Sequence, residues 1–147
     1  MGLFQSFDIS ATGMTAERFR TDVIAQNIAN ITTTRTEDGT PYRRKVVAFQ
    51  EKRFDTFDEI LNRQRYRYKG AGVKVTEVRE DTESDYIMEY DPSHPDADEN
   101  GYVSYPNVNI VTEMTNLIDA SRGYEANATA FEASKAIVQA GIGIGQG

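Results

Sequence analysis

A few residues near the middle of the chain have the types and spacing that chemistry requires. The stretch Asp96–Gly101, DADENG, fits the first half of an EF-hand calcium loop. That loop needs a bidentate glutamate at its twelfth position, where this chain has Asn107. Pro92 and Pro95 also exclude the helix that should enter such a loop. The residues favour a surface loop, and a small soluble helical dimer with a calcium- or anion-binding loop remains the alternative.

Catalytic chemistry has little support in the sequence. The single histidine, His94, lies between Ser93 and Pro95, and no neighbouring residue completes a pair of nucleophile and base. A histidine in such a place is typical of a surface turn. The chain has no cysteine, which excludes disulfides and thiolate metal sites. We therefore expect no enzyme, no catalytic residue, no metal, no cofactor and no small-molecule substrate.

Charge and hydropathy exclude further classes of protein. A formal net charge of −7 argues against a nucleic-acid binder, which needs a basic field to meet phosphates. No apolar run of about 18 residues is present, so we expect no membrane span. The first residues lack the pattern of a cleaved Sec signal. Gly2 and Ser6 match the short myristoylation pattern, which we interpret as a chance match without a lipid anchor.

The elements that must position these residues form three parts. Residues 6–33 are predicted to be helical, ending in three threonines that disfavour continuation. In the middle, residues 37–41 predict a turn, residues 42–49 and 73–78 predict strands, residues 54–61 a short helix, and residues 91–96 a loop. Basic residues crowd 43–69 and acidic residues crowd 77–99. This segregation fits two solvated faces or, alternatively, a head-to-tail contact between copies.

The third part, residues 108–138 or slightly beyond, predicts the longest helix. A row of its residues repeats at spacings of four and three over more than four heptads. This row is the heptad seam, and its members are Ile110, Met114, Leu117, Ser121, Tyr124, Ala128, Phe131, Lys135, Val138 and Ile142. Asn107 or Asn109 is a candidate N-cap. Gly141, Gly143 and Gly145 predict a loose end of this helix.

The predicted fold class is therefore α+β, with a helix at each end and a β-containing insert between them. The first helix carries one broad apolar band, formed by Ile9, Ala16, Phe19, Val23, Ile24, Asn27 and Ile31. Each terminal helix carries an apolar stripe that is longer than the middle of the chain could cover. We therefore expect the helices to pair with each other and to pack against other chains. One helical pair alone has little core. Asn27 and Asn30 are unusual, because amides lie on or near the apolar side.

Several stretches of the sequence carry a resemblance to a known family. The stretch Val23–Asn30, VIAQNIAN, resembles the N-terminal signature of the bacterial flagellar rod, hook and hook–filament junction proteins. The stretches 33–44, 101–109, 113–114 and 120–127 resemble one branch of this family, the proximal-rod proteins. Lys135 and the glycines at 141–145 depart from the family pattern, and we expect a glycine-rich tail there.

The resemblance implies a structural subunit that polymerises through its terminal helices. It implies an antiparallel, coiled-coil-like tube domain made of residues 1–33 and 107–147, with residues 34–106 as an insert outside the tube. The subunit would form part of the drive shaft and of the export channel wall. Its implied partners are other copies, other rod proteins and the flagellar type III export apparatus. Its implied location is the basal body, in the rod that crosses the periplasm.

The same resemblance suggests an assembly interface on both helices. The residues that we expect there are Phe19, Val23, Ile24, Asn27, Asn30, Ile31, Met114, Leu117, Tyr124, Phe131 and Val138. The two asparagines would satisfy groups of neighbouring copies and so fix their register, as a buried amide does in a coiled coil. The alternative is that Asn27 and Asn30 simply cap and end the first helix.

Overall fold

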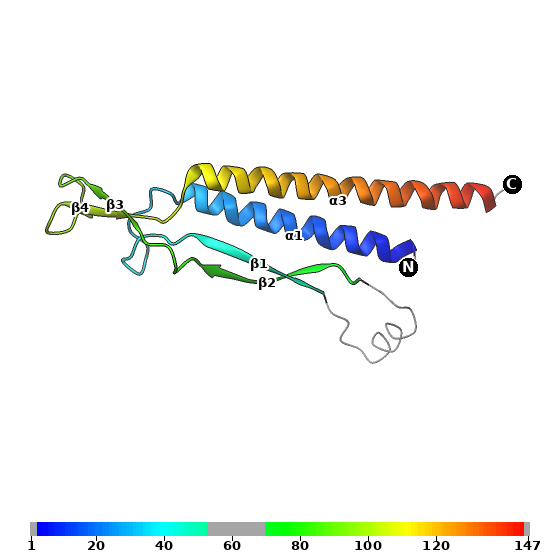
Figure 1. Ribbon diagram of the computed structural model, residues 1–147, viewed down its shortest axis with the longest axis horizontal. Coiled ribbons are helices and arrows are strands. Elements are labelled where there is room, and N and C mark those ends of the chain that lie inside the picture. The colour runs from blue at the N-terminus through cyan, green and yellow to red at the C-terminus, as the bar shows by residue number, and fades with distance from the viewer. Residues whose placement is uncertain (1–2, 53–69, 146–147) are drawn as a thin grey trace, which may run out of the picture. The chain divides into compact units, whose positions relative to one another are not determined.

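The computed structural model describes residues 3–52 and 70–145, and these form two long helices and two small sheets (Figure 1). The helices are α1, Leu3–Ala29, and α3, Ile110–Gly145. Strands β1, Lys45–Glu51, and β2, Val73–Glu80, form one sheet, and β3, Ile87–Tyr90, and β4, Tyr102–Tyr105, form the other. The α+β class is confirmed. Neither described helix is apolar over a stretch long enough to cross a bilayer.

The chain divides into two compact units, to which both helices and the first sheet contribute. Unit 1 is Met1–Phe19, Phe49–Thr76 and Ala120–Gly147, and unit 2 is Arg20–Ala48 and Glu77–Asp119. Each unit joins segments that lie far apart in the sequence, so long-range contacts hold both of them together.

In unit 1, segments of the two helices run antiparallel. Phe7 meets Phe131 edge to face, with ring centroids 4.9 Å apart. Further along α1, Gly13 faces Asn127, and a side chain at Gly13 would overlap the Asn127 amide. The contacts thus advance along α1 while they retreat along α3. The strands of this unit join the helix where Val73 N–H donates to Thr12 Oγ1, at 3.2 Å.

In unit 2, the ends of β1 and β2 are bridged by Asp81 N–H, which donates to the Arg44 carbonyl at 2.8 Å. Strands β3 and β4 form an antiparallel hairpin in which Ile87 is opposite Tyr105 and Tyr90 is opposite Tyr102. Buried residues from both chain segments of unit 2 form a small apolar core. They are Val23, Ile24, Tyr42, Val103 and Val108. This core surrounds the end of α1 and the start of α3.

Several sequence predictions agree with these elements. The strands predicted at 42–49 and 73–78 correspond to β1 and β2. The turn at 37–41 is present, and Gly39 adopts a positive φ of 78° that glycine tolerates without strain. Asn109 is the N-cap of α3, because its Oδ1 accepts from the N–H groups of Val111 and Thr112. The helix predicted at 54–61 lies outside the described residues.

Other predictions differ from the structure. Helix α1 ends at Ala29, four residues before the predicted Thr33. The loose glycine-rich end predicted for the last helix is wrong, since α3 continues through Gly141 and Gly143 to Gly145. Glycine costs a helix only about 1 kcal/mol per residue, so a long preceding helix tolerates it. The β3–β4 hairpin escaped the sequence analysis, because strands of four residues hold too few positions for a periodic pattern.

Candidate functional site

Unit 2 contains a buried polar network with Asn27 at its centre. The Asn27 side chain is 1% exposed. Its Nδ2 donates to the Lys45 carbonyl and to Glu113 Oε2, both at 2.9 Å. Its Oδ1 accepts from the Tyr42 hydroxyl and from Lys45 N–H, both at 2.9 Å. An amide side chain has two donor hydrogens and two acceptor lone pairs. All four are therefore used within the chain.

This result changes the interpretation of Asn27. We expected its amide to satisfy groups of neighbouring copies, but its four hydrogen bonds end on its own chain. The capping alternative does not describe it either, because Asn27 binds a strand and the other helix instead of its own helix end. The amide connects α1, β1 and α3 at one point of unit 2. It fixes how these segments of the unit meet.

Asn30, in contrast, behaves as the capping alternative predicts. Its Nδ2 donates to the Gln26 carbonyl at 2.9 Å, which also accepts from the Asn30 N–H, so both bonds close the last turn of α1. Its Oδ1 accepts from the Thr33 hydroxyl at 3.2 Å, and so holds the chain that leaves the helix. The two asparagines, three residues apart, therefore have different roles: Asn27 connects three segments of unit 2, and Asn30 ends α1.

The second centre of the network is an ion pair between Arg44 and Glu113. Glu113 is 0% exposed, and Arg44 donates from Nε to its Oε1 at 2.8 Å, with a second guanidinium nitrogen also 2.8 Å from that oxygen. A third Arg44 nitrogen lies 3.7 Å from Asp81 Oδ2. The Asn27 amide donates to the other oxygen of the buried carboxylate. A carboxylate that is removed from water is stable only with such partners.

Asn107 extends the network toward the loop after β2. Its Oδ1 accepts from Arg44 N–H at 2.9 Å, and its Nδ2 donates to the carbonyls of Asp81 and Ser84. Asn107 is therefore committed to this loop, while Asn109 caps α3. From the sequence, either asparagine is a candidate cap, and the hydrogen bonds assign the cap to Asn109.

The electrostatics of the network shift two pKa values. Burial, reinforced by the charges of Glu80 and Glu113, raises the pKa of the Tyr42 hydroxyl. Hydrogen bonds from Ser84 and Glu83 outweigh a smaller desolvation effect and lower the pKa of Asp81, with Arg44 adding to the effect. Both shifts favour the states that the network needs, a protonated donor at Tyr42 and a carboxylate at Asp81.

Four members of this network were not expected from the sequence. Tyr42, Arg44 and Glu113 received no role, and Asn107 was a candidate helix cap only, although a signal was present. Glu113 lies in the first turn of α3, where the helix dipole favours an acid. It is also on the side of that helix that faces the rest of the chain. A carboxylate in such a place requires a cationic partner, and the arginines just before β1 are candidates.

The loop that resembled half an EF-hand is held by hydrogen bonds within the chain. Asp96 accepts from the Thr34 hydroxyl at 2.8 Å and pairs with Arg35 at 3.6 Å. Asp98 Oδ1 accepts from the N–H groups of Asn100 and Tyr102, which makes a compact turn. Over residues 3–52 and 70–145, no three acidic or histidine side chains converge as a metal site would require. The calcium-loop alternative is not supported.

The predicted heptad seam does not coincide with the buried side of α3. The most buried positions are Glu113 and Ala120, with Asn127 and Ser134 continuing the same row at seven-residue spacing. The most buried row of α3 is therefore small or polar, and apolar periodicity could not reveal it, although Leu117, Phe131 and Val138 beside it are partly buried. Part of the seam is exposed, namely Ile110, Met114, Ser121, Tyr124, Lys135 and Ile142, and the rest, Leu117, Ala128, Phe131 and Val138, is partly buried.

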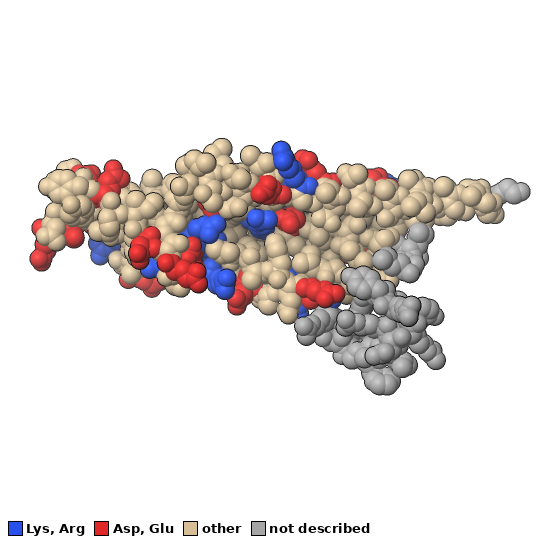
Figure 2. Space-filling view, viewed as in Figure 1, with Lys and Arg blue, Asp and Glu red and all other residues tan. Residues whose placement is uncertain are grey.

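The predicted interface residues of α1 lie at different depths. Val23 and Ile24 are buried in the core of unit 2, and Ile31 is half-buried after the helix end. Phe19 is exposed in unit 1. The C-terminal end of α3 also exposes large apolar side chains, as Phe19 does. It has no charged residue after Lys135, it is uniformly tan in Figure 2, and Ile137, Ile142 and Ile144 are exposed there.

Comparison with known proteins gives one consistent result. Residues 7–35 match the family described as "Flagella basal body rod protein", and residues 99–144 match "Flagellar basal body rod FlgEFG protein C-terminal". The chain is 42% identical to "Flagellar basal-body rod protein FlgC" of Borreliella burgdorferi, with all of both chains covered. Proteins of the same description in Bacillus subtilis and Escherichia coli O157:H7 are 43% and 38% identical, over 99% of this chain and all of theirs.

Proposed function

Because the chain belongs to the FlgC family of flagellar basal-body rod proteins, we propose that it polymerises through its terminal helices into part of the flagellar drive shaft. As a member of that family it is a structural rod subunit of the basal body and not an enzyme. What we propose beyond this role is the way in which the subunit assembles. In the assembly, the helices also form part of the wall of the export channel.

One observation carries this proposal: α3 exposes more apolar surface than a lone subunit needs. Met114 is 54% exposed, and Ile110 and Ile118, one turn to either side, are exposed as well. These three side chains, at four-residue spacing, form an apolar strip along the helix. Contiguous apolar strips on a soluble chain mark surfaces that bind other proteins. For a rod subunit, the natural partners are other copies and other rod proteins.

The interface that we propose combines this strip with the residues expected from the sequence. The exposed members make the direct contacts, and the full set is Phe19, Val23, Ile24, Asn30, Ile31, Ile110, Met114, Leu117, Ile118, Tyr124, Phe131 and Val138. Asn27 contributes indirectly, by fixing how the segments of unit 2 meet and hence the surface that they present. The buried Val23 and Ile24 support that surface from below.

We also propose how the chain is arranged in the rod and how it is exported to the rod. Residues 1–33 and 107–147 form the tube domain as an antiparallel coiled-coil-like pair, and residues 34–106 form the insert outside it. The antiparallel contacts of unit 1 and the bond between Asn27 and Glu113 in unit 2 support such a pairing. The subunit reaches the rod through the flagellar type III apparatus, without a cleaved Sec signal.

A charge in the apolar strip tests the assembly proposal. Met114→Glu alters a side chain that is exposed in the single chain, so the fold should survive. In an interface, the carboxylate would lose its water and cost several kcal/mol. We expect soluble, folded protein, absence of the subunit from isolated basal bodies and loss of motility. Phe131 is a poorer choice, because it packs on Phe7 within the chain.

Thr112→Glu is the matched control. Thr112 is exposed in the same helix and lies off the strip, and a carboxylate is favourable in the first turn. This variant should assemble and support motility. A motile strain with normal basal bodies that carries Met114→Glu would contradict the proposed interface.

A further inference from the structure

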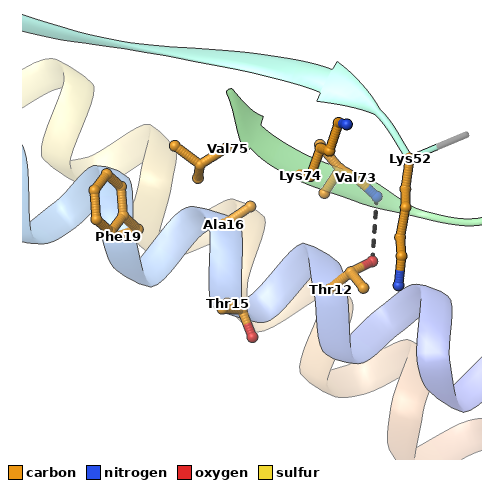
Figure 3. Close-up of a pocket in the computed structure, with 8 residues that line it drawn as sticks. All are labelled: Thr12, Thr15, Ala16, Phe19, Lys52, Val73, Lys74 and Val75. Atoms are coloured by element: carbon orange, nitrogen blue, oxygen red, sulfur yellow. Dashed lines mark hydrogen bonds between the residues drawn. The ribbon is translucent and has the colours of Figure 1, made fainter. Parts of the chain in front are cut away.

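Unit 1 contains an open groove between α1 and β2, with Lys52, the residue after β1, at one end (Figure 3). Its volume is about 420 Å³, enough to receive large side chains, and its lining is mostly apolar. Thr12, Thr15, Ala16 and Phe19 of α1 form one wall, and Lys52, Val73, Lys74 and Val75 form the other. Figure 3 shows Lys52 extended toward α1 beside Thr12, and Val75 directed toward the helix.

The groove has a definite electrostatic character. Lys52 is the cation that reaches across the groove, Lys74 extends from the opposite face of β2 to Val73 and Val75 (Figure 3), and the described residues that line the groove include no carboxylate. Phe19, at one end, is exposed, although it is a large apolar side chain. An apolar groove with a cationic rim selects an apolar or aromatic segment that is flanked by acids.

The β3–β4 hairpin of unit 2 carries a surface of that kind. Met88, Tyr90, Tyr102 and Ser104 lie on one face, because Met88 pairs with Ser104 and Tyr90 with Tyr102 across the strands. The two tyrosine rings pack edge to face with centroids 5.3 Å apart. Tyr90 is 64% exposed, and Met88 is exposed too. An aromatic pair held rigidly on a hairpin is a typical interface anchor.

The surroundings of the hairpin are acidic. Between Glu77 and Asp119, Arg79 is the sole lysine or arginine, and the loop that joins β3 to β4 carries Asp91, Asp96, Asp98 and Glu99. Figure 2 shows acidic side chains around this hairpin. Arg35 pairs with Asp96, and the other three acids leave the hairpin loop negatively charged, opposite in sign to Lys52 of the groove. The apolar face and the acids together match what the groove selects.

We propose that the groove of unit 1 receives the β3–β4 hairpin face of a second copy of this chain. Both surfaces include exposed apolar side chains in the single chain, and their charges are opposite in sign. They are different surfaces, so the contact is heterologous and repeats from copy to copy instead of closing a pair. A subunit that forms an open helical assembly needs such a contact. The inference rests on the proposed polymerisation and adds a contact outside the paired helices.

The absence of cysteine in the chain allows a clean test by cross-linking. A strain makes two forms of the subunit, Thr15→Cys in the groove and Ser104→Cys on the hairpin face. Basal bodies are isolated and treated with a short bismaleimide. We expect a cross-linked dimer of twice 16.5 kDa, in which mass spectrometry finds a peptide that joins positions 15 and 104. Each form has one thiol, so this peptide can arise only between copies.

Two controls sharpen the expected result. Thr129→Cys, exposed on α3, replaces Thr15→Cys and should give no joined peptide with position 104. Added to the Ser104→Cys form, Tyr90→Ser should lower the yield about tenfold, because an aromatic anchor is lost. Val78→Ser, which removes another exposed apolar side chain of unit 2, should leave the yield unchanged.

The inference is overturned if both forms are present in the basal bodies and no peptide joins positions 15 and 104. The proposed rod function would then stand, because incorporation shows assembly. A joined peptide between position 15 and a different protein would overturn it as well. If a form is missing from the basal bodies, Val75→Cys replaces it in the groove or Met88→Cys on the hairpin, and the same comparison decides.

Discussion

The two units join α1 to α3 by different chemistry. In unit 2 the contact is polar and saturated: the buried carboxylate of Glu113 binds Arg44 and Asn27, and the amide of Asn27 binds four groups. In unit 1 the contact is close packing, with Gly13 against Asn127 and Phe7 against Phe131. A saturated polar network accepts one arrangement, because any shift leaves a buried group unpaired. Close packing limits the distance between helices and tolerates small slips more readily.

The largest effect should follow from removal of the cation in the polar network. Arg44→Met leaves the buried Glu113 carboxylate without its ion pair, and we expect a loss of about 3–5 kcal/mol in the free energy of unfolding. Urea denaturation followed by circular dichroism measures it. Arg35→Met is the matched control, because Arg35 is 71% exposed and its pair with Asp96 is 3.6 Å long. Its loss should cost less than about 1 kcal/mol. Equal losses in the two variants would contradict a network that holds unit 2 together.

Asn27→Leu should have the next largest effect. Leucine is the better helix former, but it leaves the Tyr42 hydroxyl and both backbone groups of Lys45 without their partner. We expect a total loss of about 1–3 kcal/mol in the free energy of unfolding, because water that enters the site restores part of the hydrogen bonding of these groups. Denaturation of the purified chain detects it without any assembly.

Asn30→Leu is the comparison for Asn27→Leu. It removes two hydrogen bonds at the end of α1, to the Gln26 carbonyl and from the Thr33 hydroxyl, and should cost about 1 kcal/mol or less. If Asn30→Leu proves the more damaging of the two, the central position of Asn27 is wrong.

Because of the close packing in unit 1, Gly13→Ala should cause a smaller loss in the free energy of unfolding. Gly13→Ala places a methyl group on the Asn127 amide, which is held by its bond to the Gly123 carbonyl at 2.8 Å. Overpacking of this kind costs about 1–3 kcal/mol, offset in part by the better helix propensity of alanine. The atoms nearest to a Cβ at Gly123 belong to the side chain of Glu17, at 3.1 Å or more, and that side chain can shift slightly, so the net effect of Gly123→Ala should be near zero. The difference in unfolding midpoint between the two variants checks the contact.

The smallest expected effect is a gain in the stability of α3. Gly141 and Gly143 have open space where a Cβ would lie, so Gly141→Ala should stabilise α3 by up to about 1 kcal/mol. Helix content measured by circular dichroism should rise. An unchanged or lower helix content would contradict a helix that continues to Gly145.

Sequence reasoning succeeded where a pattern repeats and failed where single long-range partners decide. The two helices, β1 and β2 have enough residues for their periodicity to appear, and the resemblance at both ends identified the family. The polar network depends on pairs such as Arg44 with Glu113, which are 69 positions apart. No periodicity reports such a pair. The heptad seam was displaced from the most buried row for a related reason. Glu113, Ala120, Asn127 and Ser134 of that row are small or polar, so the apolar residues beside the row dominate the pattern.

Thiol reactivity at one position tests the central claim, which is that the exposed strip of α3 is covered only on assembly. A maleimide reagent is applied to Met114→Cys in the purified chain and in isolated basal bodies, with Ala120→Cys as the reference for a buried position. We predict fast labelling of position 114 in the free chain and protection in the basal body, where it should match the slow labelling of position 120. Equally fast labelling of position 114 in both states would contradict the account.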